Sequence, residues 1–427
     1  MAVVTASRRR ELKARDIAVA SMIGTAIEWY DFYVYGTSVV LVLGPLFFPT
    51  ADPLTSMLLA FSTFGVGFLA RPLGAVALSH FGDRVGRKSA LVFSLLLMGG
   101  ATVGVGLLPT YQAIGVWAPI LLVVLRCAQG FAVGGEWGGA VLLAVEHAPP
   151  GKRNRYGSYP QYGTPIGLMG SATVILLAQL LPHDAWASWG WRLPFLASLP
   201  LFAVGMWIRL RVTDAEEFQR VRRAEATLDR PVAAVARRHW RTVLLGTSVT
   251  IVCHAAYIVT TFLPSYSATM MGTTPKAGLV GMIAGSLAAI GVLLVVAGRP
   301  DAGDRRRYVV AGAVLSGLWI FPAFLLAGEL GDLGLVLGMT AGLGVLMLQY
   351  AVLPSLLADL FPVVVRYSGV SLCFQLSAVV GGALLPLLAS WSVRAVGGHY
   401  WPAAALMLAA AIVTAIGAKR INNASCA

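Results

Sequence analysis

The stretch Gly24–Pro49 reads GTAIEWYDFYVYGTSVVLVLGPLFFP, and the rest of the chain is organised around it. It lies inside an apolar run from about residue 17 to 48, which is long enough to cross a bilayer as a helix. Two acids, Glu28 and Asp31, stand near the middle of this run. A carboxylate at bilayer depth costs about 2.5–3.5 kcal/mol on insertion scales, so such residues usually face a cavity and carry function. Glu28 and Asp31 share one helix face, and Tyr35 follows four residues after Asp31.

The composition predicts a polytopic membrane protein. Of the 427 residues, 57% are apolar and only 12% are charged, about half the charged share of soluble domains. The mean hydropathy of +0.76 leaves too little polar surface to cover a soluble globule of this length. The 47 glycines and 22 prolines also fit, because membrane helices use both more often than soluble helices do.

Twelve apolar segments predict an all-α protein with twelve transmembrane helices. Their approximate bounds are 17–48, 54–79, 90–108, 115–146, 156–181, 191–211, 242–270, 276–297, 308–327, 332–360, 366–393 and 400–418. The long polar stretch between the sixth and seventh segments divides them into two similar sets of six, as in transporters built from two halves. We therefore expect an N-terminal bundle with a cytoplasmic tail (residues 1–211), a cytoplasmic central loop (212–241) and a C-terminal bundle with a short cytoplasmic tail (242–427).

The positive charge predicts orientation rather than a nucleic-acid partner. The net charge is +13, but the Lys and Arg residues fall in short clusters between apolar segments, with no basic face or aromatic platform for a strand. Most of them lie in the tails and in every second loop, which places both termini in the cytoplasm and the chain in the cell (plasma or inner) membrane. The central loop is either a solvated linker or contains an amphipathic helix at the membrane surface.

The loop between the second and third segments reads GDRVGRKS and superficially resembles a phosphate-binding loop. That motif needs four residues between its glycines and a lysine directly after the second. Here three residues separate Gly82 from Gly86, and Arg87 follows, so nucleotide binding is excluded. A cytoplasmic gate held by charges suits the loop better, although a simple positive-inside loop is the alternative. The residues assigned to gating are Arg71, Asp83, Arg84, Arg87 and Lys88, and Arg71 is equally compatible with a structural role.

Further polar residues lie inside later apolar segments. Arg126, Gln129 and Glu136 belong to the fourth segment. A guanidinium in a membrane needs an anion, which is either a carboxylate of the protein or one of the substrate. Gln161 in the fifth segment is a candidate to line the cavity. His254 in the seventh is either a proton relay that faces Asp31 or a hydrogen-bonded core residue.

Several motifs follow one another as in the metabolite:proton symporter family of the major facilitator superfamily, which the chain therefore resembles. They are EWYDFYVYG with LFFP, RPLG with GDRVGRK, RCAQGFAVGGEWGGA, GWRLPF, FLPSY and LFPVVVRYSGVSL. The resemblance implies the twelve-helix facilitator fold, proton-coupled uptake of small metabolites, and a link between Arg126 and proton coupling. Two features depart from the family: the second-half loop GRPDAGDRRR loses the expected order of charges, and the chain lacks the long heptad tail of osmosensing betaine/proline members.

We expect a proton-coupled secondary active transporter that imports a small organic acid anion by alternating access. Proton coupling is assigned to Asp31, then Glu136 and Glu28, and substrate contact to Arg126, Tyr35, Gln129, Gln161 and His254. No cofactor or metal is expected, because a proton gradient supplies the driving force, and the chain is expected to work as a monomer. A proton-driven exporter, a zwitterion symporter and a non-transporting sensor remain alternatives. The absence of HExxH, GxSxG or a Cys/His cluster argues against a membrane enzyme.

Overall fold

The computed structural model describes residues 2–38, 42–49, 53–85, 87–211, 231–299 and 304–421. Nearly all of them are helical, and these ranges contain no strand. The helices of the first half are α1 (Ala2–Ser38), α2 (Gly44–Phe47), α3 (Pro53–Arg84), α4 (Arg87–Leu107), α5 (Tyr111–Ile114), α6 (Trp117–Glu146), α7 (Arg153–Gly157), α8 (Tyr159–Ala178), α9 (His183–Ser188), α10 (Leu193–Leu196) and α11 (Ser198–Arg211).

The second half also consists of helices, and two π-helical turns interrupt its longer helical segments. Its helices are α13 (Pro231–Arg238), α14 (Trp240–Ala255), α15 (Leu263–Met270), α16 (Pro275–Ala297), α17 (Arg305–Tyr350), α18 (Leu353–Asp359), α19 (Arg366–Ser377), α20 (Leu385–Ala395) and α21 (Trp401–Arg420). The π-helical turns Ile258–Phe262 and Ala378–Leu384 join α14 to α15 and α19 to α20.

Each predicted apolar segment coincides with one or more of these helices. By length and hydropathy alone, eight helical spans within the described ranges could cross a membrane. One of them, Arg305–Asp359, contains two predicted segments, because α17 reverses direction at Gly331, whose φ is +56°. The reversal brings Trp319 beside Gly338, and the Trp319 Nε1 donates a hydrogen bond of 2.9 Å to the Gly338 carbonyl. α17 is therefore a pair of antiparallel helices.

The first segment differs from the prediction at both ends. The residues before position 17 were expected to be a tail, but α1 already begins at Ala2, because Arg, Glu, Leu, Lys and Ala are all good helix formers. At the other end α1 stops at Ser38, and a separate short helix, α2, starts at Gly44 with Pro45 in its first turn. Proline is well tolerated there because the first N–H groups of a helix have no intrahelical partner.

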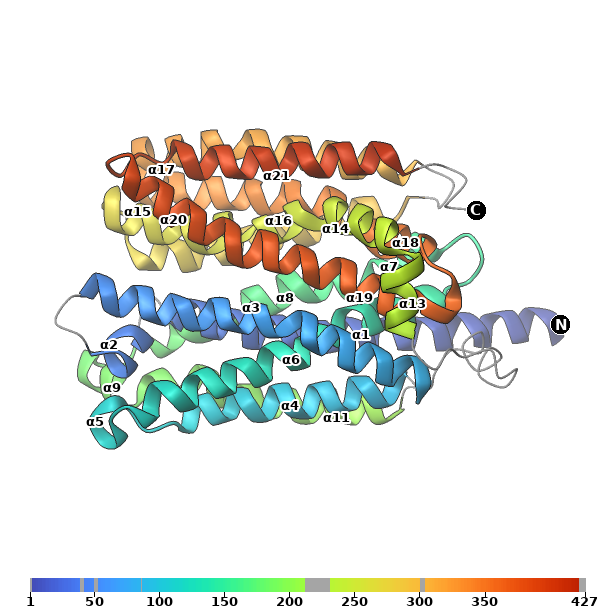
Figure 1. Ribbon diagram of the computed structural model, residues 1–427, viewed down its shortest axis with the longest axis horizontal. Coiled ribbons are helices and arrows are strands. Elements are labelled where there is room, and N and C mark those ends of the chain that lie inside the picture. The colour runs from blue at the N-terminus through green and yellow to red at the C-terminus, as the bar shows by residue number, and fades with distance from the viewer. Residues whose placement is uncertain are drawn as a thin grey trace.

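Figure 1 shows the helices of the first half on one side of the molecule and those of the second half on the other, with the long helices of both halves lying roughly along the long axis of the molecule. Both chain ends lie at the same end of the molecule, together with α7, α13 and α18. Where the halves meet, α8 packs on α16, and α19 packs on α3 and α6. Within the predicted central loop, residues 212–230 lie outside the described residues, whereas α13 packs on α3 and α19.

Small residues let the helices of the first half approach closely. A Cβ added to Gly74 of α3 would lie 1.8 Å from the Phe131 carbonyl oxygen of α6. A Cβ added to Gly130 of α6 would likewise lie 2.0 Å from the Gly67 carbonyl oxygen. Glycine is therefore required at both positions, as is common where membrane helices pack. Outward-facing leucines such as Leu69 and Leu73, which are 60% and 67% exposed, give the protein an apolar exterior suited to lipid.

Candidate functional site

The two acids of α1 are buried at the centre of the first half. The exposed fraction of Glu28 is 4% and that of Asp31 is 2%. The Oδ2 of Asp31 accepts a hydrogen bond of 3.0 Å from the Thr102 hydroxyl of α4. Its other oxygen, Oδ1, has no hydrogen-bond partner among the described residues. A buried carboxylate with one oxygen unsatisfied is costly in its charged form, so it is suited to taking up a proton.

A chain of hydrogen bonds links Asp31 to Arg126. The Gln129 Nε2 donates to the Thr102 hydroxyl oxygen at 2.6 Å, and the Arg126 NH1 donates to the Gln129 Oε1 at 2.8 Å. The i, i+3 spacing on α6 brings Arg126 and Gln129 to one helix face. Asp31 and Arg126 are therefore connected through two polar side chains rather than by a direct ion pair.

The Arg126 guanidinium is also held by an aromatic ring. Its central carbon lies 3.7 Å from the ring centroid of Tyr35, a distance typical of a cation–π contact. The Tyr35 hydroxyl in turn shares a hydrogen bond with the Thr63 hydroxyl of α3. Gly67 leaves space for the Arg126 guanidinium, because a Cβ added at position 67 would lie 2.9 Å from the Arg126 NH2.

Two cavities lie beside these residues. The first, here called the polar cavity, is lined by side chains that include Glu28, Asp31, Arg71, Arg126 and Gln129. All five belong to the first half of the chain. Two acids and two guanidinium groups thus face one small space.

The second, here called the central cavity, lies between the two halves. Its lining is mainly apolar and includes several aromatic rings, a few hydroxyl groups and one imidazole. The first half supplies Trp29, Tyr33 and Thr164, and the second half supplies His254, Tyr257 and Tyr350. A largely apolar cavity with a few directed polar groups is the usual form of a small-molecule site.

The halves also touch directly beside the central cavity. The Trp137 ring of α6 stacks on Phe374 of α19 with centroids 3.6 Å apart and an interplanar angle of 4°. The Trp137 Nε1 donates to the Gln161 Oε1 at 3.1 Å, and the Gln161 Nε2 donates to the Tyr350 carbonyl at 2.9 Å. These contacts join first-half helices to both α17 and α19.

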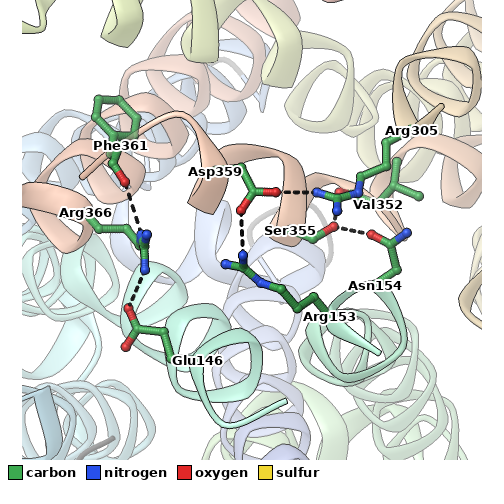
Figure 2. Close-up of polar contacts among 9 residues, drawn as sticks. All are labelled: Glu146, Arg153, Asn154, Arg305, Val352, Ser355, Asp359, Phe361 and Arg366. Carbon is green, nitrogen blue, oxygen red and sulfur yellow. Dashed lines mark hydrogen bonds and ion pairs between the residues drawn. The ribbon is translucent and has the colours of Figure 1, made fainter. Parts of the chain in front are cut away.

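At the end of the molecule where both termini lie, charged residues pair across the halves (Figure 2). The NH1 of Arg366, at the start of α19, lies 3.2 Å from the Glu146 Oε1 at the end of α6. The NH1 of Arg153 in α7 lies 3.0 Å from the Asp359 Oδ1 at the end of α18. Each half thus contributes one acid and one base. We call Glu146, Arg153, Asp359 and Arg366 the latch.

Two neighbouring contacts support the latch. Asp359 also binds Arg305 of its own half, with 2.6 Å between NH1 and Oδ2, and the Ser355 hydroxyl donates to the Asn154 side chain across the halves. The Glu146 side chain is fully buried and that of Arg366 is 11% exposed. Because solvent hardly reaches this pair, salt screens it less than an exposed ion pair.

The structure brings together some predicted site residues and separates others. Five predicted residues share the polar cavity: Glu28, Asp31, Arg71, Arg126 and Gln129. His254 lines the central cavity. His254 does not face Asp31. Its Nδ1 lies 2.9 Å from the Ser377 hydroxyl, and its ring packs edge-on against Phe374. His254 is thus hydrogen-bonded through Nδ1, and its role as a proton relay stays a prediction.

Three other predicted residues lie away from the two cavities. Glu136 accepts a hydrogen bond of 2.8 Å from the Ser94 hydroxyl of α4, Gln161 is engaged as described above, and Tyr35 is fully buried against Arg126. The predicted gating side chains of Asp83, Arg84, Arg87 and Lys88 lie outside the described residues.

Sequence reasoning missed Thr102 and the latch. Nothing in the sequence marks Thr102 as functional, because a threonine in an apolar helix is common and usually hydrogen-bonds the backbone of its own helix. The latch residues do show a recognisable pattern in the sequence. Glu146 precedes Arg153 by seven residues, and Asp359 precedes Arg366 by the same number of residues in the other half. A search for charge spacings that recur in both halves would have found it.

A two-halved helical bundle with an apolar exterior, a buried ionisable cluster and a cavity between its halves defines a multi-pass membrane transporter. The model of the Major Facilitator Superfamily matches residues 18–303. The inner membrane metabolite transport protein YhjE of Escherichia coli is 39% identical over 410 residues, which cover 93% of each chain. The shikimate transporter of Escherichia coli is 37% identical over 419 residues, covering 96% of this chain and 95% of that protein.

The chain therefore belongs to the Major Facilitator Superfamily. Among solved structures, the proton:xylose symporter XylE of E. coli superposes with a TM-score of 0.78 at 14% identity, covering 94% of both chains. At that identity the likeness concerns the fold alone. The predicted fold class and the predicted family resemblance are confirmed, and the relatives are transporters rather than enzymes.

Proposed function

We propose that the protein is a proton-coupled symporter that imports a small organic acid by alternating access. The observation that carries the proposal is the hydrogen-bonded chain from Asp31 through Thr102 and Gln129 to Arg126, buried beside the polar cavity. Its proton site is Asp31, whose Oδ1 remains available inside the polar cavity. The driving force is the proton gradient, with no cofactor, and the working unit is a monomer.

Coupling follows from the cost of a buried charge. Asp31 without a proton places a negative charge at bilayer depth, which costs about 2.5–3.5 kcal/mol on insertion scales. Binding a proton removes that charge, and the hydrogen-bonded chain links this change to Arg126 on α6. Since α6 also carries Trp137 and ends in Glu146, one rigid helix connects the proton site to both the central cavity and the latch.

The latch supports alternating access. It closes the end of the molecule that carries both termini, which the distribution of Lys and Arg places in the cytoplasm. In this arrangement substrate enters from the opposite side, and breaking the latch pairs opens the cytoplasmic side. A membrane potential of about 100 mV contributes about 2.3 kcal/mol for each proton that enters in excess of the substrate's negative charge, and one such proton corresponds to somewhat less than 50-fold accumulation.

An organic acid is the substrate class that fits these charges best. The polar cavity holds two guanidinium groups, and one relative is named as a transporter of shikimate, a hydroxylated carboxylate. A proton-driven exporter would use the same residues, so the direction of transport must be measured.

The proposal is tested with purified protein in liposomes that contain a pH-sensitive dye. Addition of a transported acid such as shikimate should acidify the lumen, and a proton ionophore should abolish accumulation. Accumulation that survives the ionophore would exclude proton coupling. Substrate-driven proton exit with a reversed gradient would instead identify an exporter.

A further inference from the structure

Arg71 is a buried cation packed against aromatic rings. It lies on α3, and only 4% of its surface is exposed. Its guanidinium carbon lies 4.8 Å from the ring centroid of Phe32 and 4.4 Å from that of Phe68. Contacts of this kind cover the flat faces of the guanidinium. Its five N–H donors lie in the plane between these faces, where the Tyr257 side chain also interacts with Arg71.

No carboxylate of the described residues forms an ion pair with Arg71, although Glu28 and Asp31 line the same cavity. Arg126 differs, because it donates to Gln129 and stacks on Tyr35. A buried guanidinium is costly unless an anion compensates it. Of the two guanidinium groups in the polar cavity, Arg71 is thus the one suited to an anion from outside the protein.

Arg71 also lies where the two cavities meet. Tyr257, which lines the central cavity, interacts with Arg71. The rings of Phe32 and Phe68 pack against Tyr257 with centroids 5.3 and 5.4 Å away. These three rings form the partition between the central and polar cavities. Tyr257 therefore links the lining of the central cavity to Arg71.

We propose that Arg71 binds the carboxylate of the substrate, while the body of the substrate occupies the central cavity. This assignment rests on the proposed uptake of an organic acid, and it gives Arg71 a binding role in place of the gating role expected from sequence. The ligand is a small monocarboxylate with a flat body, which stacks on the aromatic lining and takes hydrogen bonds from groups such as Thr164. Its charge would arrive beside Glu28 and Asp31, where an accompanying proton offsets it.

The test uses pairs of probes that differ only in charge: shikimate and its amide, benzoate and benzamide, and succinate and succinamate. Dissociation constants are measured by calorimetry on purified wild-type protein and on Arg71→Gln. We expect at least one acid to bind tenfold or more tightly than its amide. Arg71→Gln should remove that difference and leave the affinity for the amide within twofold. Arg307→Gln, at a side chain that is 87% exposed, is the matched control and should keep the difference.

A second variant keeps the test decisive if Arg71→Gln does not fold. Arg71→Lys retains the charge but loses the planar fork that grips a carboxylate with two parallel bonds. The affinity for the acid should fall about three- to tenfold, with no change for the amide. A wild-type protein that does not prefer any acid, or an unchanged preference in the Arg71 variants, would overturn the proposal.

These outcomes are separate from those of the proposed function. Acid-selective binding that depends on Arg71, combined with uptake that ignores the proton gradient, would refute the symport and leave the binding site intact. Proton-coupled uptake of an acid in an Arg71→Gln protein with normal affinity would refute the binding site and leave the symport intact.

Discussion

Glu146 and Arg366 form an ion pair of 3.2 Å that joins the end of α6 to the start of α19, although 220 positions separate them in the chain. The Glu146 carboxylate is fully buried, so loss of Arg366 would remove a charge that compensates it. The pair exists only while the two halves are together at this end. Its energy therefore acts on the equilibrium between the closed and open arrangements.

The first prediction concerns this pair. Arg366→Ala should destabilise the closed arrangement by about 2 kcal/mol or more, because one member of a buried pair at an interface is removed. That corresponds to a shift of roughly 30-fold toward the open arrangement. Hydrogen exchange read by mass spectrometry should show faster exchange in α7 and α18. Unchanged exchange in both helices would show that the pair does not hold the halves together.

A charge exchange supplies the control for the latch. Glu146→Arg combined with Arg366→Glu restores the pair with reversed polarity, and it should recover most of the slow exchange lost in either single variant. The second pair, Arg153 and Asp359, should tolerate the exchange less well, because Asp359 also binds Arg305. Equal recovery for both pairs would contradict the role given to Arg305.

Close helix packing gives a second prediction. Gly74→Ala should lower the thermal stability strongly or prevent folding, because the added Cβ would overlap the Phe131 carbonyl oxygen at 1.8 Å. Gly100→Ala on α4 is the matched control, since nothing lies within 4 Å of its added Cβ. Alanine in a helix is favoured over glycine by about 0.5–1 kcal/mol. The melting temperature of Gly100→Ala should therefore stay equal or rise. A similar loss of thermal stability in both variants would show that helix packing at Gly74 is not the cause of its effect.

The sequence predicted the fold and the first-half acids well, but not their partners. A long apolar run and two acids are local features, so the burial of Glu28 and Asp31 could be foreseen. The link from Asp31 to Arg126 could not, because it depends on Thr102, a residue without a distinctive pattern, and on the rotation of α4 against α6. The engagement of His254 by Ser377 likewise depends on how α14 and α19 pack together.

A third prediction separates the two arginines of the polar cavity. Arg126→Lys keeps the charge but loses the planar contact with the Tyr35 ring and the directed bond to Gln129. If Arg126 belongs to the coupling chain, the pH dependence of uptake should change while the affinity for an acid stays within about threefold. An unchanged pH profile with weakened acid binding would return Arg126 to the substrate-binding role expected from sequence.

The central claim is that Asp31 carries the coupled proton, and Asp31→Asn tests it most directly. The amide is nearly the same size as the carboxyl group and accepts the Thr102 hydrogen bond, but it cannot take up a proton. Asp332→Asn, at an exposed aspartate outside both cavities, is the control and should transport normally.

The measurement compares two modes in the same liposomes: accumulation of a labelled acid under an imposed proton gradient, and exchange of labelled for unlabelled acid without a gradient. We predict that Asp31→Asn abolishes accumulation and retains exchange, with binding within about tenfold of wild type. Full accumulation by Asp31→Asn under the gradient would contradict the account.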